Sequence, residues 1–156
     1  MNSLKMTYCV EIQEVFDLGL MLDCGQAFRW EKDENGIFSG VASGVVMRAK
    51  QENGKLMFFG NTKDDFERVF RRYLDFDRDY KSITDSYSTD KYLSLAVGEF
   101  SGIRILRQEP WEALCSFIIS QNNNIPRIKG IISRLCENFC ENLGGGLFTF
   151  PSPEVI

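Results

Sequence analysis

Histidine is absent from this 156-residue sequence, which removes the commonest general base and the commonest metal ligand among protein side chains. Cysteine does not supply a metal-binding motif in place of histidine. The five cysteines are odd in number and contain no C-x-x-C pair, so the sequence predicts no disulfide framework. Cys136 and Cys140 lie four residues apart, but two thiols without further ligands are more typical of a helix core. We therefore predict no metal site and no cofactor.

An apolar run of about 18 residues, which a membrane-spanning helix needs, is also missing. The first residues, Met1 to Lys5, lack the apolar segment of a signal peptide. These two absences predict a cytoplasmic protein with no membrane partner. The short N-terminus without a targeting extension favours a prokaryotic source.

The composition is that of a folded globular protein, with 44% hydrophobic residues and 13 phenylalanines to fill a core. The length fits one domain, or a small domain plus part of another. Net charge is −4, which argues against a nucleic-acid partner only if the charge is spread evenly. Residues 101–135 carry five basic and two acidic side chains, or +3, which leaves −7 for the remainder. Charge alone does not distinguish a binding surface from chance variation.

The first 60 residues have the pattern of an antiparallel sheet. Asn35-Gly36 and Asn53-Gly54 are strong signals for type I′ hairpin turns, and Ser43-Gly44 is a weaker one. Short runs rich in β-branched and aromatic residues flank these turns. They predict strands at Tyr8–Ile12, Ala27–Glu31, Ile37–Val41, Val45–Ala49 and Leu56–Phe59.

Helical periodicity begins at residues 64–74, where Thr62 and Asp65 have the spacing of a capping box. Arg71-Arg72 on this helix is interpreted as a solvated face. A second helix is predicted from about Thr89 to Phe100. A third begins near Pro110 and is apolar on nearly all sides, so we expect it to be buried. A fourth follows Asn124 and turns Ile128, Ile131, Ile132, Leu135, Cys136 and Phe139 inward. Strands followed by helices predict the α+β class.

Three consecutive asparagines, Asn122 to Asn124, separate the last two helices. Amides carry donors and an acceptor, so this corner suits a polar, hydrogen-bonding ligand. Arg127 adds a guanidinium suited to phosphates or base edges. At the end of the chain, Phe150-Pro151-Ser152-Pro153-Glu154 is typical of a helix start. A chain that stops two residues later is expected to be truncated.

In their order and spacing, these motifs resemble the 8-oxoguanine DNA glycosylases. The resemblance covers residues 8–156 and rests on Gly25-Gln26-Ala27-Phe28-Arg29-Trp30, residues 102–110, Ser116-Phe117-Ile118, and Asn122 to Asn124 with Arg127. It implies a TATA-binding-protein-like sheet domain at residues 1–104. The start of a helix-hairpin-helix glycosylase domain, truncated, would follow at 105–156. The implied partner is double-stranded DNA containing 8-oxoguanine, and the implied activity is base excision followed by strand cleavage.

The resemblance also implies roles for four residues. The Gly25 carbonyl would read the protonated N7 of 8-oxoguanine, although without the resemblance we would interpret Gly25 as a turn glycine. Asn122 would lie near the vacated space and the opposite base. Asn124 would either cap a helix or position the DNA backbone. Arg127 would contact the opposite cytosine, and a phosphate contact or a surface salt bridge is the alternative.

No catalytic residue is assigned within this chain. The lysine nucleophile and the aspartate that the family uses are expected beyond Ile156, so the isolated chain is predicted to be inactive. One alternative is a fragment of an alkylated-base glycosylase. Another is a non-catalytic module that binds DNA or protein. Apolar helices left without partners would let the chain self-associate through residues 111–139.

Overall fold

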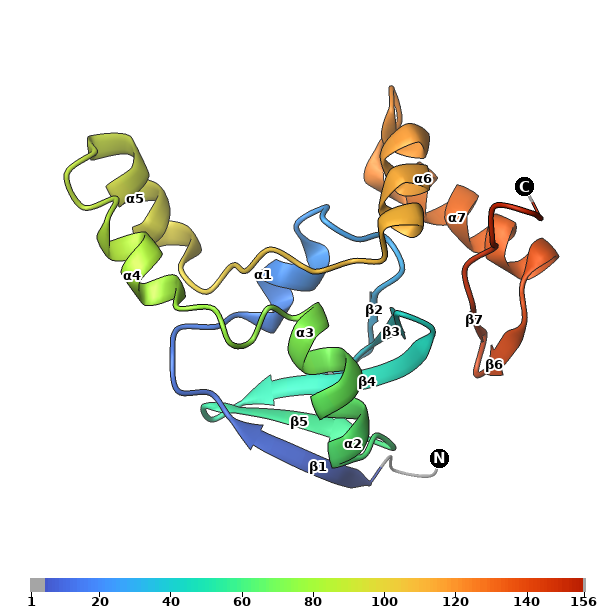
Figure 1. Cartoon of the computed structure of the whole chain (residues 1–156), viewed down its shortest axis with the longest axis horizontal. Coiled ribbons are helices and arrows are strands. Elements are labelled where there is room, and N and C mark those ends of the chain that lie inside the picture. The colour runs from blue at the N-terminus through green and yellow to red at the C-terminus, as the bar shows by residue number, and fades with distance from the viewer. Residues whose placement is uncertain (1–4, 156) are drawn as a thin grey trace.

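The computed structural model describes residues 5–155 and has a five-stranded antiparallel sheet in the order β1-β5-β4-β3-β2 (Figure 1). Residues 1–4, on which the predicted absence of a signal peptide partly rests, lie outside the described part, as does Ile156. The strands are β1 (Met6–Glu11), β2 (Glu31–Lys32), β3 (Phe38–Ala42), β4 (Val45–Glu52) and β5 (Lys55–Phe59). A sheet combined with helices confirms the α+β class.

Two of the hairpin turns have the predicted geometry. Both residues of Asn53-Gly54 and both residues of Ser43-Gly44 have positive φ, as a type I′ turn requires. Asn35-Gly36 differs, because only Gly36 has positive φ. There the Asp33 carboxylate accepts hydrogen bonds from the backbone N–H groups of Asn35 and Ile37, which favours a longer loop.

One predicted strand is wrong. Residues 27–30 are irregular, and only Glu31 and Lys32 of that region pair with β3. Trp30 leaves no room for a side chain on the neighbouring strand, since a Cβ placed on Gly40 would lie 2.3 Å from the indole. The ring is buried there, and its Nε1–H donates to the Tyr73 hydroxyl at 3.0 Å.

The main core lies between the sheet and two helical segments. Helix α1 (Leu18–Asp23) buries Leu18, Met21 and Leu22. The second segment runs through α2 (Lys63–Asp65), a π-helical turn (Phe66–Phe70) and α3 (Arg71–Tyr73). It begins with the predicted capping box between Thr62 and Asp65. Phe58 of β5 stacks on Phe70 with ring centroids 5.5 Å apart, which fixes the segment against the sheet.

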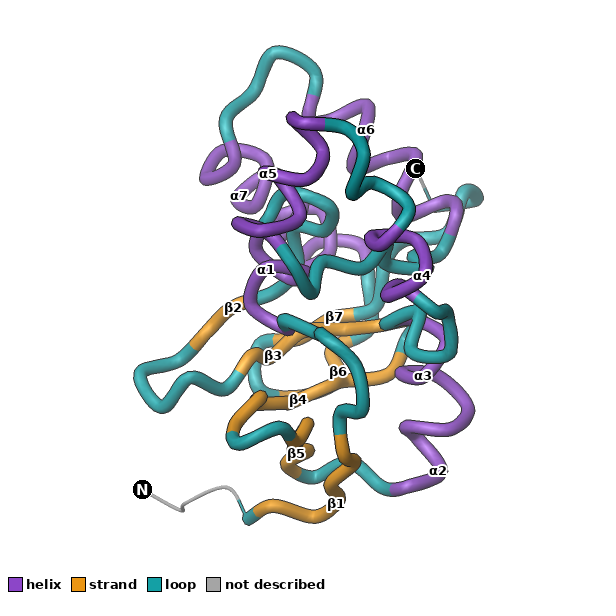
Figure 2. The backbone as a smooth tube through the Cα atoms, turned by 90° about the vertical axis from the view of Figure 1, so that its left-hand side faces the viewer, coloured by secondary structure: helices purple, strands orange, loops and turns teal. Residues whose placement is uncertain are grey.

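The remaining helices extend from the two sides of this core. In Figure 1, α4 (Tyr80–Asp85) and α5 (Lys91–Phe100) project on one side. On the other lie α6 (Pro110–Ser120), α7 (Ile125–Phe139) and the hairpin of β6 (Asn142–Gly144) and β7 (Leu147–Phe148). An extended segment, residues 103–109, connects the two sides. In Figure 2 the sheet lies below and most helices lie above it. Across residues 5–155, no helix is long and apolar enough to cross a membrane.

The expectation that the helix after Pro110 is buried is wrong. Leu114, Phe117 and Ile118 of α6 are 50, 65 and 60% exposed, because α6 packs on α7 with one side only. Helix α7 turns Ile128, Ile132 and Cys136 inward as predicted, whereas Phe139 is 55% exposed. At the end of the described chain, Val155 N–H donates to the Ser152 carbonyl at 3.1 Å, which closes a single turn.

Candidate nucleic-acid interface

The three asparagines between α6 and α7 have separate roles. Asn123 donates from its amide to the carbonyl of Ile119 at 2.7 Å and so closes the end of α6. Asn124 is the N-cap of α7, because its amide oxygen accepts from Arg127 N–H at 3.0 Å. Of the two roles weighed for Asn124, capping is the one the structure contains.

Asn122 is the amide of this corner that faces outward. Its backbone has φ of 56°, a left-handed conformation that asparagine tolerates better than most residues. Its side chain is exposed and forms no hydrogen bond with residues 5–155. The donor and acceptor groups of Asn122 are therefore open to a ligand.

Arg127 lies in the first turn of α7 and is exposed. Its guanidinium forms no ion pair or hydrogen bond within the described chain. The surface salt bridge considered for this residue thus has no acidic partner there. A contact with the opposite base and a contact with a phosphate both stay predictions.

Gly25 follows the end of α1 and has φ of +88°, a conformation that glycine adopts without strain. The turn interpretation of this glycine therefore holds. The interpretation does not exclude ligand binding, because the Gly25 carbonyl accepts no hydrogen bond from residues 5–155 and a Cβ built on it would meet open space. The carbonyl is available as an acceptor.

Gln26 fixes the position of this turn, a role that the sequence did not reveal. Its side-chain amide donates to the Arg104 carbonyl at 2.9 Å and accepts from Leu106 N–H at 3.0 Å. Its backbone carbonyl accepts from the Gln108 side chain at 2.6 Å. Gly25 therefore precedes a residue that is hydrogen-bonded three times to the segment that leads into α6.

A largely buried ion pair joins the same region to α6, and hydrogen bonds from its arginine join the region to residues 148–149. Arg29 donates to the Glu112 carboxylate of α6 at 2.9 Å, with the two side chains 10 and 16% exposed. It also donates to the carbonyls of Phe148 and Thr149. Burial raises the pKa of Glu112, and Arg29 acts against that rise. The motif at residues 25–30 does not predict this ion pair, because Glu112 is 83 residues away in the sequence.

The basic segment at residues 101–135 is not a uniform DNA-facing surface. Arg104 is 3% exposed and donates to the carbonyls of Asp75, Phe76 and Arg78 and to the Glu14 carboxylate. Lys129 donates to the Trp30 carbonyl at 3.0 Å. These basic groups stabilise the fold, so the +3 of this segment overstates the charge available to DNA.

The thiols are free, as the absence of a disulfide framework predicts for the described cysteines. Cys136 is buried in α7, and burial raises its pKa to about 12. A thiol with this pKa is inert at neutral pH, as expected for a core cysteine. Among residues 5–155, no three histidine, cysteine or acidic side chains gather as metal ligands. The absence of a metal and of a cofactor stays a prediction.

Comparison with known proteins gives one consistent family. The sequence model of the family described as 8-oxoguanine DNA glycosylase, N-terminal domain, matches residues 9–114. An N-glycosylase/DNA lyase of Saccharomyces cerevisiae is 34% identical over 160 residues, which cover 89% of this chain and 42% of that protein.

Solved structures give the same result. The apo 8-oxoguanine glycosylase/lyase of Clostridium acetobutylicum is 37% identical, with a TM-score of 0.90 over 97% of this chain and 54% of that one. The same enzyme with double-stranded DNA containing cytosine opposite 8-oxoguanine is 34% identical, with a TM-score of 0.86 over 96% of this chain and 56% of that one. The chain thus spans about half the length of these relatives.

Proposed function

Because the chain belongs to the 8-oxoguanine DNA glycosylase family, we propose that it forms the N-terminal part of a DNA glycosylase and AP lyase that excises 8-oxoguanine from duplex DNA. The observation that carries the proposal is the Gly25 carbonyl, an unoccupied acceptor in a turn that the Gln26 hydrogen bonds hold in place. Enzymes of this kind must take the damaged base out of the stack, and a flipped base needs a fixed group to read it.

A carbonyl at Gly25 suits 8-oxoguanine for a chemical reason. N7 of guanine is an acceptor, whereas N7 of the oxidised base carries a proton and is a donor. A carbonyl therefore attracts the damaged base and repels the normal one. Because the discriminating group belongs to the backbone, the glycine matters through its conformation rather than through a side chain.

The asparagine corner supplies the remaining proposed contacts. Asn122 would approach the space that the flipped base vacates, since its amide is exposed and unbonded within the described chain. Arg127 would donate to O2 and N3 of the opposite cytosine, which are both acceptors. Asn124 supports these contacts from behind by beginning the helix that carries Arg127.

We assign no catalytic residue to this chain. A lysine nucleophile needs a lowered pKa in a desolvated pocket. The Asp85 carboxylate instead raises the pKa of Lys81. Lys129, one of the more enclosed lysines, lies 3.6 Å from the Asp23 carboxylate and 3.8 Å from that of Glu31, in a setting of ion pairs. The lysine nucleophile and its aspartate belong in the half of the relatives' length that this chain does not span.

A chimaera tests the proposal. Residues 1–150 would be joined to the matching C-terminal part of the Clostridium acetobutylicum enzyme, which is similar enough for the interface to form. We expect the chimaera to cut a duplex with 8-oxoguanine opposite cytosine and to be trapped on it by borohydride. The 156-residue chain alone should give no trapped adduct.

The outcomes separate the alternatives. A folded chimaera that leaves 8-oxoguanine in place contradicts the proposal, and one that removes an alkylated base instead supports the alkylated-base alternative. A borohydride adduct on the 156-residue chain would contradict the assignment of the nucleophile to another part of the protein.

A second, compatible proposal is self-association of the isolated chain through residues 111–139. Leu114, Phe117 and Ile118 form an exposed apolar face on α6, and such faces mark interaction surfaces. Sedimentation should show concentration-dependent dimers that Phe117→Asp removes. Thr89→Asp, at an exposed polar position outside residues 111–139, is the matched control and should leave the dimers intact.

We also propose that the protein works in the cytoplasm of a prokaryote, with its activity associated with the nucleoid. DNA is the proposed partner, and the nucleoid is where a prokaryotic cell holds it. A fluorescent fusion that coincides with stained DNA would support this location, and one that accumulates in the cell envelope would contradict it.

A further inference from the structure

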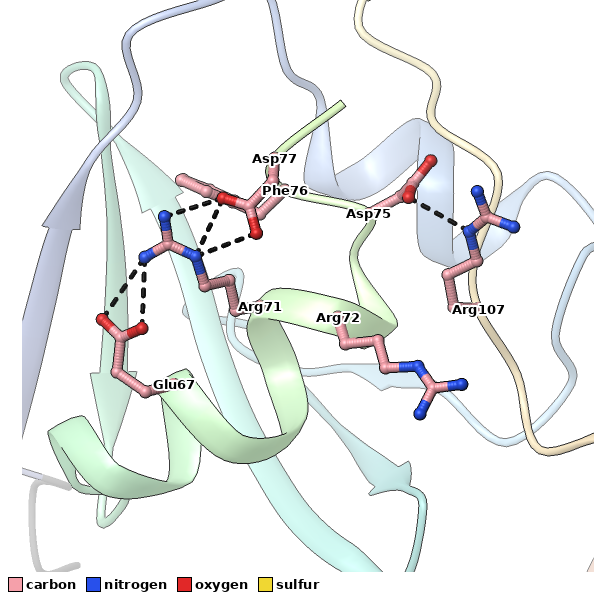
Figure 3. Close-up of a pocket in the computed structure, with 7 residues that line it drawn as sticks. All are labelled: Glu67, Arg71, Arg72, Asp75, Phe76, Asp77 and Arg107. Carbon is pink, nitrogen blue, oxygen red and sulfur yellow. Dashed lines mark hydrogen bonds and ion pairs between the residues drawn. The ribbon is translucent and has the colours of Figure 1, made fainter. Parts of the chain in front are cut away.

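Two neighbouring recesses lie where the helical segment α2–α3 meets residues 107–110. The larger, about 320 Å³, is drawn in Figure 3; its carboxylates and two of its arginines come from residues 67–77, and Arg107 is its third arginine. The smaller, about 210 Å³, lies between α3, the β3–β4 turn and the start of α6. Arg72 and Arg107 line both, so the two recesses are neighbours that share two arginines.

The carboxylates of the larger recess are already occupied. Asp77 accepts from Nε of Arg71 through both oxygens, at 2.9 and 3.0 Å, and Glu67 accepts from the same guanidinium at 3.2 Å. The hydrogen bond with Asp77 raises the pKa of Arg71 and lowers that of Asp77. These three side chains pair with one another on the outer edge of the recess and together carry a net charge of −1.

Asp75 is engaged as well. It accepts hydrogen bonds from Arg107 Nε at 3.0 Å and from the Tyr80 hydroxyl at 2.9 Å, and it forms an ion pair with Arg78, whose Nε lies 3.1 Å away. Asp75 therefore has three partners among residues 5–155, and Arg72 is not one of them. The terminal nitrogens of Arg107, in contrast, form no hydrogen bond with residues 5–155, and Arg107 lines the smaller recess as well as the larger.

Arg72 is the arginine of this feature whose guanidinium has no partner in the part of the chain that the structure describes. Figure 3 shows it turned away from the Arg71–Asp77 pair. It is the second residue after the π-helical turn Phe66–Phe70, a local rearrangement that is frequent at functional sites. Arg72 is exposed, which agrees with the solvated helix face interpreted from the sequence and leaves its guanidinium accessible to a ligand.

We infer that the smaller recess binds a phosphate group, held by the guanidinium of Arg72 with Arg68 and Arg107 beside it. These three arginines line it against one acid, Glu109. The Glu109 carboxylate is directed to Glu112 N–H, which it caps at 2.9 Å. Arg68 forms an exposed ion pair with Asp64. Exposed ion pairs are weak, so the Arg68 guanidinium can leave Asp64 and bind the phosphate. Ser43 on the β3–β4 turn adds a hydroxyl donor to the rim.

The inferred site is distinct from the asparagine corner. It lies at the start of α6, and the asparagines follow its end, so the 11-residue helix separates them by about 16 Å. Its ligand could be a phosphate of the DNA backbone or a free phosphate. Guanidinium groups recognise both through the same paired N–H···O contacts.

Titration of inorganic phosphate into the 15N-labelled chain, at constant ionic strength, tests the site directly. We expect saturable shifts at Arg72, Arg107 and Ser43. Arg72→Gln should weaken phosphate binding by about tenfold, since it removes one charge-assisted contact. Arg134→Gln is the matched control, because Arg134 is an exposed arginine on α7 outside both recesses. Arg72→Lys, which keeps the charge without the fork, should fall between.

Absence of saturable shifts, or equal binding by the Arg72 and Arg134 variants, would overturn the inference. Unchanged thermal melting of each variant ensures that a loss of binding is not a loss of fold. A second titration with an undamaged duplex identifies the source. If the site takes a DNA phosphate, Arg72→Gln also lowers the salt dependence of duplex binding by about one unit of slope. If duplex binding is unchanged while phosphate binding falls, the site takes free phosphate.

Discussion

Replacing Arg29 by glutamine should destabilise this protein in a way that depends on pH. The substitution leaves the Glu112 carboxylate buried without its cation, and it weakens the contacts with the carbonyls of Phe148 and Thr149. Breaking a buried ion pair by removing one partner costs roughly 3–5 kcal/mol, because the remaining charge is uncompensated. We expect a loss of about 4 kcal/mol in the free energy of unfolding at pH 8.

The pH dependence follows from Glu112. Its pKa in the folded state already lies above the usual value of 4.5 because burial outweighs the effect of Arg29. Without Arg29 the folded-state pKa rises further, so the folded protein holds a proton that the unfolded chain releases. Stability then falls as pH rises from about 4.5 through the folded-state pKa, by about 1.4 kcal/mol per pH unit.

At pH 5 the raised pKa of Glu112 in the variant favours the protonated, neutral carboxyl in the folded protein more than at pH 8, so the loss of stability is smaller. The loss in the free energy of unfolding at pH 5 should be about 2 kcal/mol, mainly because the carbonyls of Phe148 and Thr149 lose the hydrogen bonds from Arg29. Urea unfolding at pH 5 and pH 8 measures the difference. The double variant Arg29→Gln with Glu112→Gln should remove the pH-dependent part. An equal loss at both pH values, or a double variant with the same pH dependence as the single one, would refute the reasoning.

Three further substitutions probe the core and the asparagine corner. Tyr73→Phe removes the acceptor of the buried Trp30 indole N–H and should lower the free energy of unfolding by about 1–3 kcal/mol in urea titrations. Gly40→Ala places a Cβ 2.3 Å from the same indole and should lower the free energy of unfolding by more than about 2 kcal/mol. Gly98→Ala, with open space around it, should instead stabilise α5 by about 0.5–1 kcal/mol. Thermal melts of the two variants measure the difference. Asn124→Ala removes the N-cap of α7 and should cost about 1 kcal/mol, with faster amide hydrogen exchange in its first turn.

Features that depend on neighbouring residues in the sequence were predictable. The Asn53-Gly54 turn needs only two residues that accept positive φ. The capping box of Thr62 and Asp65 and the N-cap at Asn124 each close within one helical turn. Turns and helix caps depend on residues that are close in the sequence, so the sequence predicts them. The positions of the hairpin turns predict the strands that flank them.

Features that depend on distant partners were not predictable. The sequence cannot say that the Arg104 guanidinium is taken up by carbonyls 26 to 29 residues away, so its charge was counted as available. It cannot say that Trp30 requires an irregular chain beside Gly40 instead of a strand. The apolar residues of α6 indicated burial because the sequence shows which residues are apolar and does not show what packs on them. The short helix α4 lacked a periodic signal altogether.

For the proposed site the same distinction has a physical meaning. The family resemblance names Gly25 and Asn122 as residues that would contact the ligand themselves, and both roles stay predictions. Gln26, Arg29 and Arg104 could not be named in this way, because they act through residues about 80 to 120 positions away or through the loop before α4. Gln26 and Arg29 connect segments on the two sides of the proposed domain boundary at residue 104. Arg104 lies at that boundary and anchors it. A carbonyl that must distinguish a donor from an acceptor at N7 has to stay in place to a fraction of an ångström, and these buried contacts provide that rigidity.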